Sequence, residues 1–135
     1  MSSNNIINQN TIIIKYQDFV PDIRREEYEA LKNSIKDKGL HLPIIVNQKN
    51  NVLLDGHHRY RVCQELGIEP RFETKMFEDE FEEKEFVIEI NLKRRQLPEW
   101  EKLELALKLE DIYKEKARIR RFNNLKNVNV KEIIT

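Results

Sequence analysis

The sequence predicts an α+β fold in which helices lie on a small sheet and a helical region follows. Three observations lead to this class. Short apolar runs rich in β-branched residues, such as Thr11–Tyr16, have the length and composition of strands. Segments with apolar residues three or four positions apart alternate with these runs, as expected for amphipathic helices. After Pro98 only helical periodicity remains, until the chain becomes rich in asparagine beyond Arg121.

The first half of the chain alternates the two kinds of element. Residues 11–16 are expected to form a strand, and residues 22–38 a helix that Gly39 ends. The two apolar runs around the polar "NQKNN" predict a β-hairpin over residues 43–56. Residues 57–66 are expected to form a second helix, because apolar side chains lie on one side of it and a glycine follows.

The second half begins with an expected strand over residues 71–77, followed by a helix over residues 79–93. Pro98 separates this helix from a last, long one. The apolar stripe of the last helix is wider than one small core needs and comprises Trp100, Leu103, Leu105, Leu107, Leu109 and Ile112. The width indicates either a homodimer interface through residues 100–112 or packing against the chain's own domain.

This order of elements divides the chain into four parts. Residues 1–10 are expected to be a disordered N-terminus, residues 11–97 the sheet-containing domain, and residues 98–122 a helical extension. Residues 123–135 are a tail or the start of a truncated helix-turn-helix, since "NVNVKEIIT" is typical of the opening of such a motif.

Charge and composition limit the function classes. The net charge of zero argues against a uniformly basic nucleic-acid-binding surface. Basic residues nevertheless predominate after the acidic helix, so any direct DNA contact is expected to be weak and confined to the region from Lys93 to Lys126. DNA is otherwise expected to be bound indirectly or through missing C-terminal elements. The single cysteine excludes an internal disulfide, and the chain has neither a membrane-length apolar segment nor a signal peptide. We therefore expect a cytoplasmic protein that does not bind membranes.

The segment "LLDGHHRYRVCQELGIEP" predicts an anion site. Gly56 links a strand to a helix, and the first turn of a helix presents unpaired N–H groups that bind phosphate. Arg59 and Arg61 add guanidinium groups, which can hold phosphate through two parallel hydrogen bonds. The alternative is that Asp55 caps the helix and the cations are merely solvated.

Metal and thiol chemistry are not expected at this turn. Adjacent histidines on a helix diverge by about 100°, so His57 and His58 are poorly placed to share one ion, and we expect no zinc. Cys63 lies on the apolar side of the helix and is expected to be a buried, unreactive thiol.

With these residues in view, the chain resembles the ParB/sulfiredoxin-like superfamily from about Thr11 to Ile112. Three boxes in order carry the resemblance. "LKNSIKDKGLHLPIIV" is similar to the family's helix, glycine and strand entry, "LLDGHHRYRVCQELGI" to its "GERRxRA" box, and "INLKRRQLPEWEKLELA" to its "ENxQRxxLxPxEEA" box. The resemblance implies a ParB/sulfiredoxin-like fold with a small mixed sheet and packed helices.

The resemblance also implies a ParB-like N-terminal domain of a centromere-binding protein, which acts in chromosome partition, plasmid segregation or DNA-linked regulation. Nucleotide binding would close a dimeric clamp on DNA, with other partition proteins as partners. The nucleotide would be CTP, with ATP or ADP as alternatives, together with Mg²⁺. The nucleotide-binding positions carried over are Gly56, His57, His58, Arg59, Arg61, Asn91, Arg94 and Arg95, with Asn91 also a Mg²⁺ ligand. Ile90 replaces the family's metal-linked glutamate.

The same superfamily implies enzymatic alternatives. Sulfiredoxin activity is not expected, because His57 stands where its catalytic cysteine would be. The free-serine kinase branch shares "DGHHR" letter for letter, which would make Asp55 a catalytic carboxylate with Asp22 or Glu26 as the upstream acid. A ParB-like nuclease is a further alternative, although the turn lacks a dense group of carboxylates for two-metal cleavage.

Overall fold

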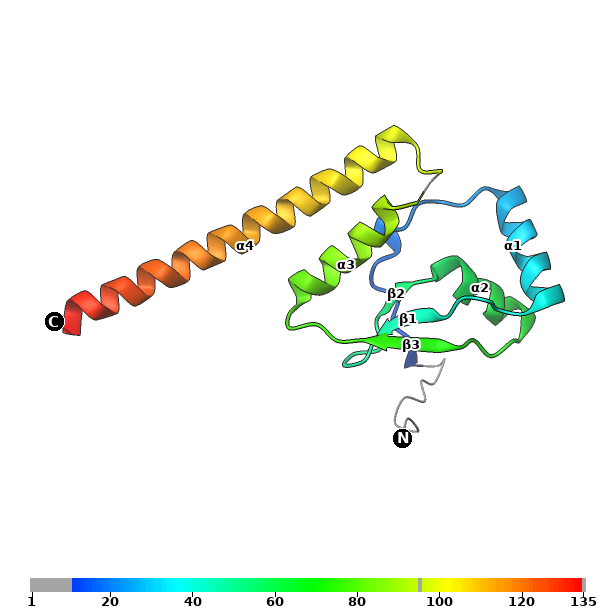
Figure 1. Cartoon of the computed structure of the whole chain (residues 1–135), viewed down its shortest axis with the longest axis horizontal. Coiled ribbons are helices and arrows are strands. Elements are labelled where there is room, and N and C mark those ends of the chain that lie inside the picture. The colour runs from blue at the N-terminus through cyan, green and yellow to red at the C-terminus, as the bar shows by residue number, and fades with distance from the viewer. Residues whose placement is uncertain (1–10, 95, 135) are drawn as a thin grey trace.

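The computed structural model describes residues 11–94 and 96–134. The elements follow in the order η3 (Gln17–Phe19), α1 (Arg25–Lys38), β1 (Ile44–Asn47), β2 (Leu53–Asp55), α2 (His57–Leu66), β3 (Phe72–Lys75), α3 (Glu80–Leu92) and α4 (Glu99–Ile134) (Figure 1). This is the predicted α+β class with a helical C-terminal region. The predicted disorder of residues 1–10 and the predicted contact of Arg95 lie outside the described residues.

The three strands form a mixed sheet in the order β2-β1-β3. Strands β1 and β2 are the two arms of the predicted hairpin and pair antiparallel, with Ile45 opposite Asp55. Strands β1 and β3 are parallel, with Ile44 opposite Phe72, and helix α2 provides the crossover that a parallel pair needs. The central strand therefore begins beside the turn that links β2 to α2.

Helices cover both faces of the sheet in layers (Figure 1). One face packs on α2 through Ile44, Val46, Leu53 and Tyr60. The other face packs on α3 through a cluster that contains Tyr16, Val52, Leu54 and Val87. Helix α1 lies outside α2, and α4 lies outside α3, each with its own apolar contact. Because side chains alternate along a strand, neighbours such as Leu53 and Leu54 point into different layers.

The strand predicted for residues 11–16 is wrong. Only Ile13 pairs with the sheet, through a single bridge to Val52, and the residues after it have no strand geometry. The chain leaves the sheet because Tyr16 is directed to the buried Glu83 of α3, to which its hydroxyl donates a hydrogen bond.

A buried polar cluster joins this segment to the hairpin and to α3. Glu83 is 2% exposed and accepts hydrogen bonds from Tyr16 Oη, from Asn47 Nδ2 and, at 3.3 Å, from Asn50 Nδ2. Lys15 Nζ lies 3.7 Å from the same carboxylate. Burial, together with the Glu83 carboxylate, raises the pKa of Tyr16, so this phenol stays protonated and keeps donating. The cluster fixes the position of α3 relative to the sheet.

The apolar stripe of the last helix is divided between two faces. Leu105 and Ile112 are buried against Ile88 of α3, while Trp100 and Leu103 are exposed. Helix α4 continues without a break to Ile134, past the boundary predicted at residue 122. Its distal half leaves the body of the molecule (Figure 1). In the described part of the chain, no helix is apolar enough over its length to cross a membrane.

Candidate functional site

The turn between β2 and α2 requires a glycine. Gly56 has φ 97°, in the left-handed region that residues with a side chain avoid. A Cβ atom placed there would lie 3.2 Å from Arg59 Nη2 and 3.2 Å from Ile44 Cγ1. The glycine thus allows the sharp turn and also keeps Arg59 close to the backbone at the start of α2.

Gly56, and not Asp55, is the N-cap residue of α2, and no side chain caps this helix. The interpretation of Asp55 as a helix cap is therefore wrong, because the carboxylate belongs to the strand and points elsewhere. The backbone N–H groups in the first turn of a helix have no intrahelical acceptor. Together with the helix dipole they favour a negatively charged group at this end of α2.

The side chains of Arg59 in α2 and Arg94, two residues after α3, meet at Asp55. Arg59 Nη2 lies 3.6 Å from one carboxylate oxygen, and Arg94 Nη2 lies 3.9 Å from the other. Arg94 is oriented by Asn91, whose carboxamide oxygen accepts a hydrogen bond of 2.8 Å from Arg94 Nε. The structure thus brings the two predicted boxes together, with one carboxylate facing two guanidinium groups.

The two histidines occupy different environments. His58 Nε2 donates a hydrogen bond to the carbonyl of Pro21 at 3.1 Å, which ties the start of α2 to the segment before α1. His57 is 5% exposed, and burial, aided by His58 and Arg94, lowers its pKa to about 4. Burial lowers the pKa of His58 as well. Both imidazoles are therefore neutral at pH 7.

Two buried nitrogen atoms at the turn have no hydrogen-bond partner among the described residues: His57 Nε2 and Arg59 Nη1. A buried polar atom without a partner is unfavourable by about 1–3 kcal/mol, so such atoms often mark a position that a ligand fills. Burial also lowers the pKa of Arg59, although Asp55 opposes this effect. The guanidinium can only donate, so its missing partner must be an acceptor.

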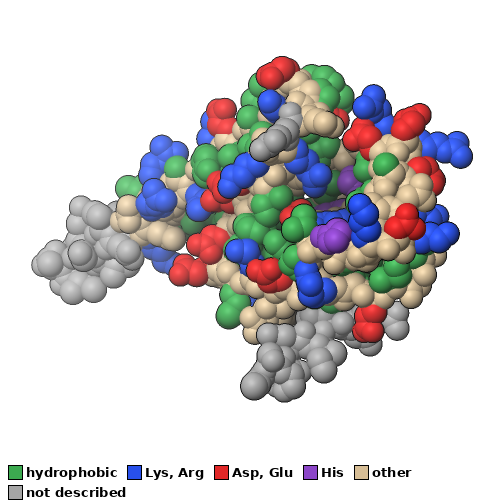
Figure 2. Space-filling view, turned by 45° about the vertical axis from the view of Figure 1, so that its right-hand side comes forward, with side chains coloured by type: hydrophobic (Ala, Val, Ile, Leu, Met, Phe, Trp, Pro, Cys, Tyr) green, Lys and Arg blue, Asp and Glu red, His purple; other side chains and the backbone are tan. Residues whose placement is uncertain are grey.

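These side chains line a cavity of about 370 Å³. Its wall is formed by Ile23, Leu31, Leu42, Asp55, Gly56, His57, His58, Arg59, Ile90 and Arg94. We call it the arginine cavity. A second cavity of about 830 Å³, the tyrosine cavity, shares the two histidines and adds Asp22, Tyr60, Arg61 and Gln64. Figure 2 shows histidine side chains beside Lys and Arg side chains, where the surface is hollowed.

Other predicted site residues are placed differently. Arg61 is exposed, its guanidinium lies 4.9 Å from the Tyr28 ring centroid, and it forms an ion pair with Glu65. Of the two cavities it lines the tyrosine cavity but not the arginine cavity. Asn91 is 1% exposed, and its Nδ2 donates a hydrogen bond to the Val87 carbonyl. Its Oδ1 accepts from Arg94 Nε, which orients the Arg94 side chain. Cys63 is buried, as predicted, and burial raises the pKa of its thiol.

The apolar wall of the arginine cavity was not predicted. The sequence identifies Ile90 only as the replacement of a family glutamate, and nothing local to Ile23, Leu31 or Leu42 indicates that they line a cavity with Gly56. Glu26, one of the two candidate upstream acids, is not among the residues lining either cavity, whereas Asp22 lines the tyrosine cavity.

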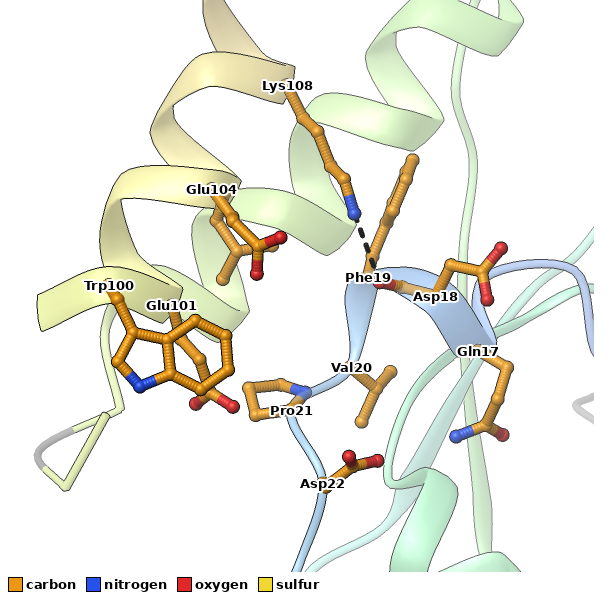
Figure 3. A pocket seen from close by; sticks show the side chains of 11 residues that line it. Gln17, Asp18, Phe19, Val20, Pro21, Asp22, Trp100, Glu101, Glu104 and Lys108 are labelled. Carbon is orange, nitrogen blue, oxygen red and sulfur yellow. Dashed lines mark hydrogen bonds between the residues drawn. The ribbon is translucent and has the colours of Figure 1, made fainter. Parts of the chain in front are cut away.

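A third hollow of about 300 Å³ lies between η3 and the start of α4. Figure 3 shows Trp100, Glu101 and Glu104 of α4 facing Pro21 and Asp22, with Lys108 bonded to the Asp18 carbonyl at 3.1 Å. The described residues contain no group of three or more His, Cys, Asp or Glu side chains that could hold a metal ion.

Comparison with protein families gives a match to the ParB N-terminal domain over residues 2–90. No curated protein matches the chain. Among solved structures, the C2221 form of a Pnob8-like ParB-N domain is similar, with a TM-score of 0.73 and 24% identity over 89% of this chain and 49% of that one. A second structure of the pNOB8-like ParB N-domain has a TM-score of 0.71 and 23% identity over 89% of this chain and 46% of that one.

The C-terminally truncated chromosome-partitioning protein ParB from Caulobacter crescentus, complexed with CTP-γ-S, is also similar. Its TM-score is 0.54 at 24% identity, over 66% of this chain and 52% of that one. The chain thus spans about half the length of the structures that it matches. These likenesses show the fold and agree with the sheet and helix order described above.

Proposed function

Since the chain belongs to the ParB N-terminal domain family, we propose that it binds the phosphates of a nucleotide in the arginine cavity and acts in DNA partition or DNA-linked regulation. The observation that carries this proposal is the convergence of Arg59, Arg94 and the α2 N-terminus on one cavity. CTP is the first candidate, because the similar ParB from Caulobacter crescentus was solved with CTP-γ-S. ATP and ADP are the alternatives.

The charge of the cavity supports a phosphate ligand. Asp55 is the only carboxylate among the described residues that line it, and it faces two guanidinium groups while both histidines are neutral. One positive charge is therefore unmatched, and the helix N-terminus adds to it. Phosphate oxygens would supply the acceptor that Arg59 Nη1 lacks. They would also accept hydrogen bonds from the backbone N–H groups in the first turn of α2.

A Mg²⁺ ion would be held mainly by the nucleotide phosphates. Magnesium usually keeps several waters and takes only one or two protein ligands beside substrate phosphates. Asn91 is the family position for a ligand, but its carboxamide oxygen accepts from Arg94. Ligation by Asn91 would therefore require that hydrogen bond to open, and the role that its present position supports is orientation of Arg94.

Contacts with DNA and other partition proteins belong to the same proposal. The exposed basic side chains Arg120 and Lys126 on distal α4 are available for a DNA backbone. With a net charge of zero, such contact would be weak and salt-dependent.

The second candidate is a small-molecule phosphotransferase of the free-serine kinase type. The observation in its favour is the tyrosine cavity, which adjoins the arginine cavity at the two histidines and has Asp22 in its wall. A second substrate held there would lie beside the phosphates, with Asp22 as the acid near the first helix. Asp55, held between two arginines, is better placed to orient them than to accept a proton.

Calorimetric titration tests the proposal. CTP, ATP and ADP with Mg²⁺ are titrated into the wild-type chain and into Arg59→Ala, Arg61→Ala and Arg120→Ala. We expect CTP to bind most tightly and Arg59→Ala to weaken binding by about tenfold or more, because a charge-assisted, bidentate contact is lost. Arg61→Ala should have a smaller effect, since that side chain is stacked on Tyr28, and Arg120→Ala should have none.

The alternatives give different results. Unchanged binding by Arg59→Ala, or no binding of any nucleotide, contradicts the anion site. Formation of phosphoserine from serine and ATP or ADP would contradict the partition function and support the kinase function.

A further inference from the structure

Helix α4 carries a row of residues on the side away from α3. Their spacing is three or four throughout, which places them on one face of a helix. The row consists of Trp100, Leu103, Leu107, Asp111, Lys114, Arg118, Phe122 and Leu125, and we call it the outer row. The opposite face holds Leu105 and Ile112, which are buried against α3.

The outer row has two apolar ends and a charged middle. Each of its five apolar side chains is more than half exposed. Single exposed apolar residues are common, but a regular series of large ones on one helix face marks a contact surface. Asp111, Lys114 and Arg118 separate the two apolar ends.

The row is complementary to itself when it is reversed. In an antiparallel pair with matched ends, Trp100 lies opposite Leu125 and Leu103 opposite Phe122. In the centre, Asp111 of each copy lies opposite Lys114 of the other. Arg118 falls opposite Leu107, which its aliphatic stem can cover. A parallel pair would instead place Asp111 opposite Asp111 and Lys114 opposite Lys114, which repel.

We propose that two copies of this chain associate through the outer rows of their α4 helices, packed antiparallel about a two-fold axis near residues 112 and 113. Such an interface is isologous: each apolar end of one helix meets the other end of its partner. The part of α4 from residue 99 to 126 is about 42 Å long. Its distal half leaves the body, so a partner helix can approach it (Figure 1).

This pairing does not depend on the nucleotide proposal. It goes beyond an interface over residues 100–112, because it assigns the distal segment around Phe122 and Leu125 as the surface that the proximal leucines bind. It also predicts which charges face each other.

Sedimentation velocity over a wide range of concentrations tests the apolar contact. We expect a reversible dimer without nucleotide, and a dissociation constant about a hundredfold higher for Leu103→Asp, because each of two equivalent contacts loses a leucine and buries a charge. Ala106→Asp, which adds the same charge on another face of α4, is the matched control and should dimerise like the wild type. A monomeric wild type, or Leu103→Asp dimerising as well as the control, overturns the proposal.

Charge exchange tests the orientation. Asp111→Lys and Lys114→Asp each place like charges opposite one another twice in the dimer, so each should raise the dissociation constant about fivefold. The double variant Asp111→Lys, Lys114→Asp restores both pairs and should return to within about twofold of the wild type. A double variant as weak as the single variants contradicts the antiparallel register, and circular dichroism of each variant verifies that α4 is intact.

Discussion

At the scale of single residues, His57 has the most unusual environment. It lies at the first position of α2, is almost fully buried, and has an imidazole nitrogen without a partner among the described residues. Its pKa of about 4 in the folded protein compares with 6.5 for an ordinary histidine. The fold therefore disfavours the protonated form.

This environment predicts a loss of stability in mild acid. As the pH falls below 6.5, His57 becomes protonated in the unfolded chain, whereas in the folded chain it stays neutral down to about pH 4. The free energy of unfolding therefore falls as the pH falls through this window. The expected loss from His57 is about 2 kcal/mol between pH 7 and about pH 4.5. His58 contributes in the same direction.

Urea unfolding at several pH values measures this effect. His57→Gln keeps a polar group near the position of Nε2 and cannot titrate, so its stability should decline less than that of the wild type over the same window. His58→Gln serves as a comparison for the neighbouring imidazole. Parallel pH profiles for wild type and His57→Gln would show that His57 is not buried in its neutral form.

The sequence predicts correctly those properties of single residues that depend on their immediate neighbours in the chain. The need for glycine at residue 56 and the burial of the Cys63 thiol followed from the local pattern. The role of Asp55 did not follow from the pattern, because the last residue of β2 and the N-cap residue of α2 are adjacent in the sequence. The approach of Arg94 to Asp55 depends on where α3 ends, which a pattern places only within a few residues.

At the scale of elements, α3 connects the site to the rest of the fold. Its first half carries Glu83, which binds the N-terminal segment and the hairpin turn. Its end carries Asn91, which orients Arg94 two residues beyond the helix. A single rigid helix thus joins a buried carboxylate to one wall of the arginine cavity.

Glu83→Gln should destabilise the protein by about 2–4 kcal/mol. The amide that replaces one oxygen would direct its hydrogens toward Tyr16 or Asn47, both of which donate, and would leave buried donors unpaired. Denaturant unfolding measures the change, and Glu89→Gln on the exposed side of the same helix should change stability by less than about 0.5 kcal/mol. Equal effects of the two substitutions would contradict a structural role for the buried cluster.

The hairpin and helix 57–66 were predicted correctly because glycines and polar turns mark their ends. The buried Glu83 was missed because it stands among other glutamates, and nothing local distinguishes it from Glu82. Its partners Tyr16 and Asn47 are 67 and 36 residues away along the chain. The same long-range bond explains why residues 11–16 do not remain a strand.

At the scale of the whole molecule, the five layers α1, α2, sheet, α3 and α4 determine which surfaces are free. The site forms where α2 begins on one side of the sheet and α3 ends on the other. Family membership and the mixed sheet were predicted, since three boxes in order constrain topology more than any one of them. The length of α4 was not predicted, because its asparagine-rich end has the composition of a tail.

The exposed course of α4 has a consequence for amide hydrogen exchange. Among the side chains that the structure describes up to residue 126, the last of α4 bonded to the body is Lys116, whose Nζ lies 2.7 Å from Glu85. Beyond that point the described helix is held by its own backbone hydrogen bonds, which open readily in water when nothing packs on them. In dilute protein, deuterium uptake should therefore rise along α4 from Leu105 to Leu125. At high concentration the gradient should flatten, and uniform uptake in dilute protein would show that the far end of the helix is covered by something other than a second copy.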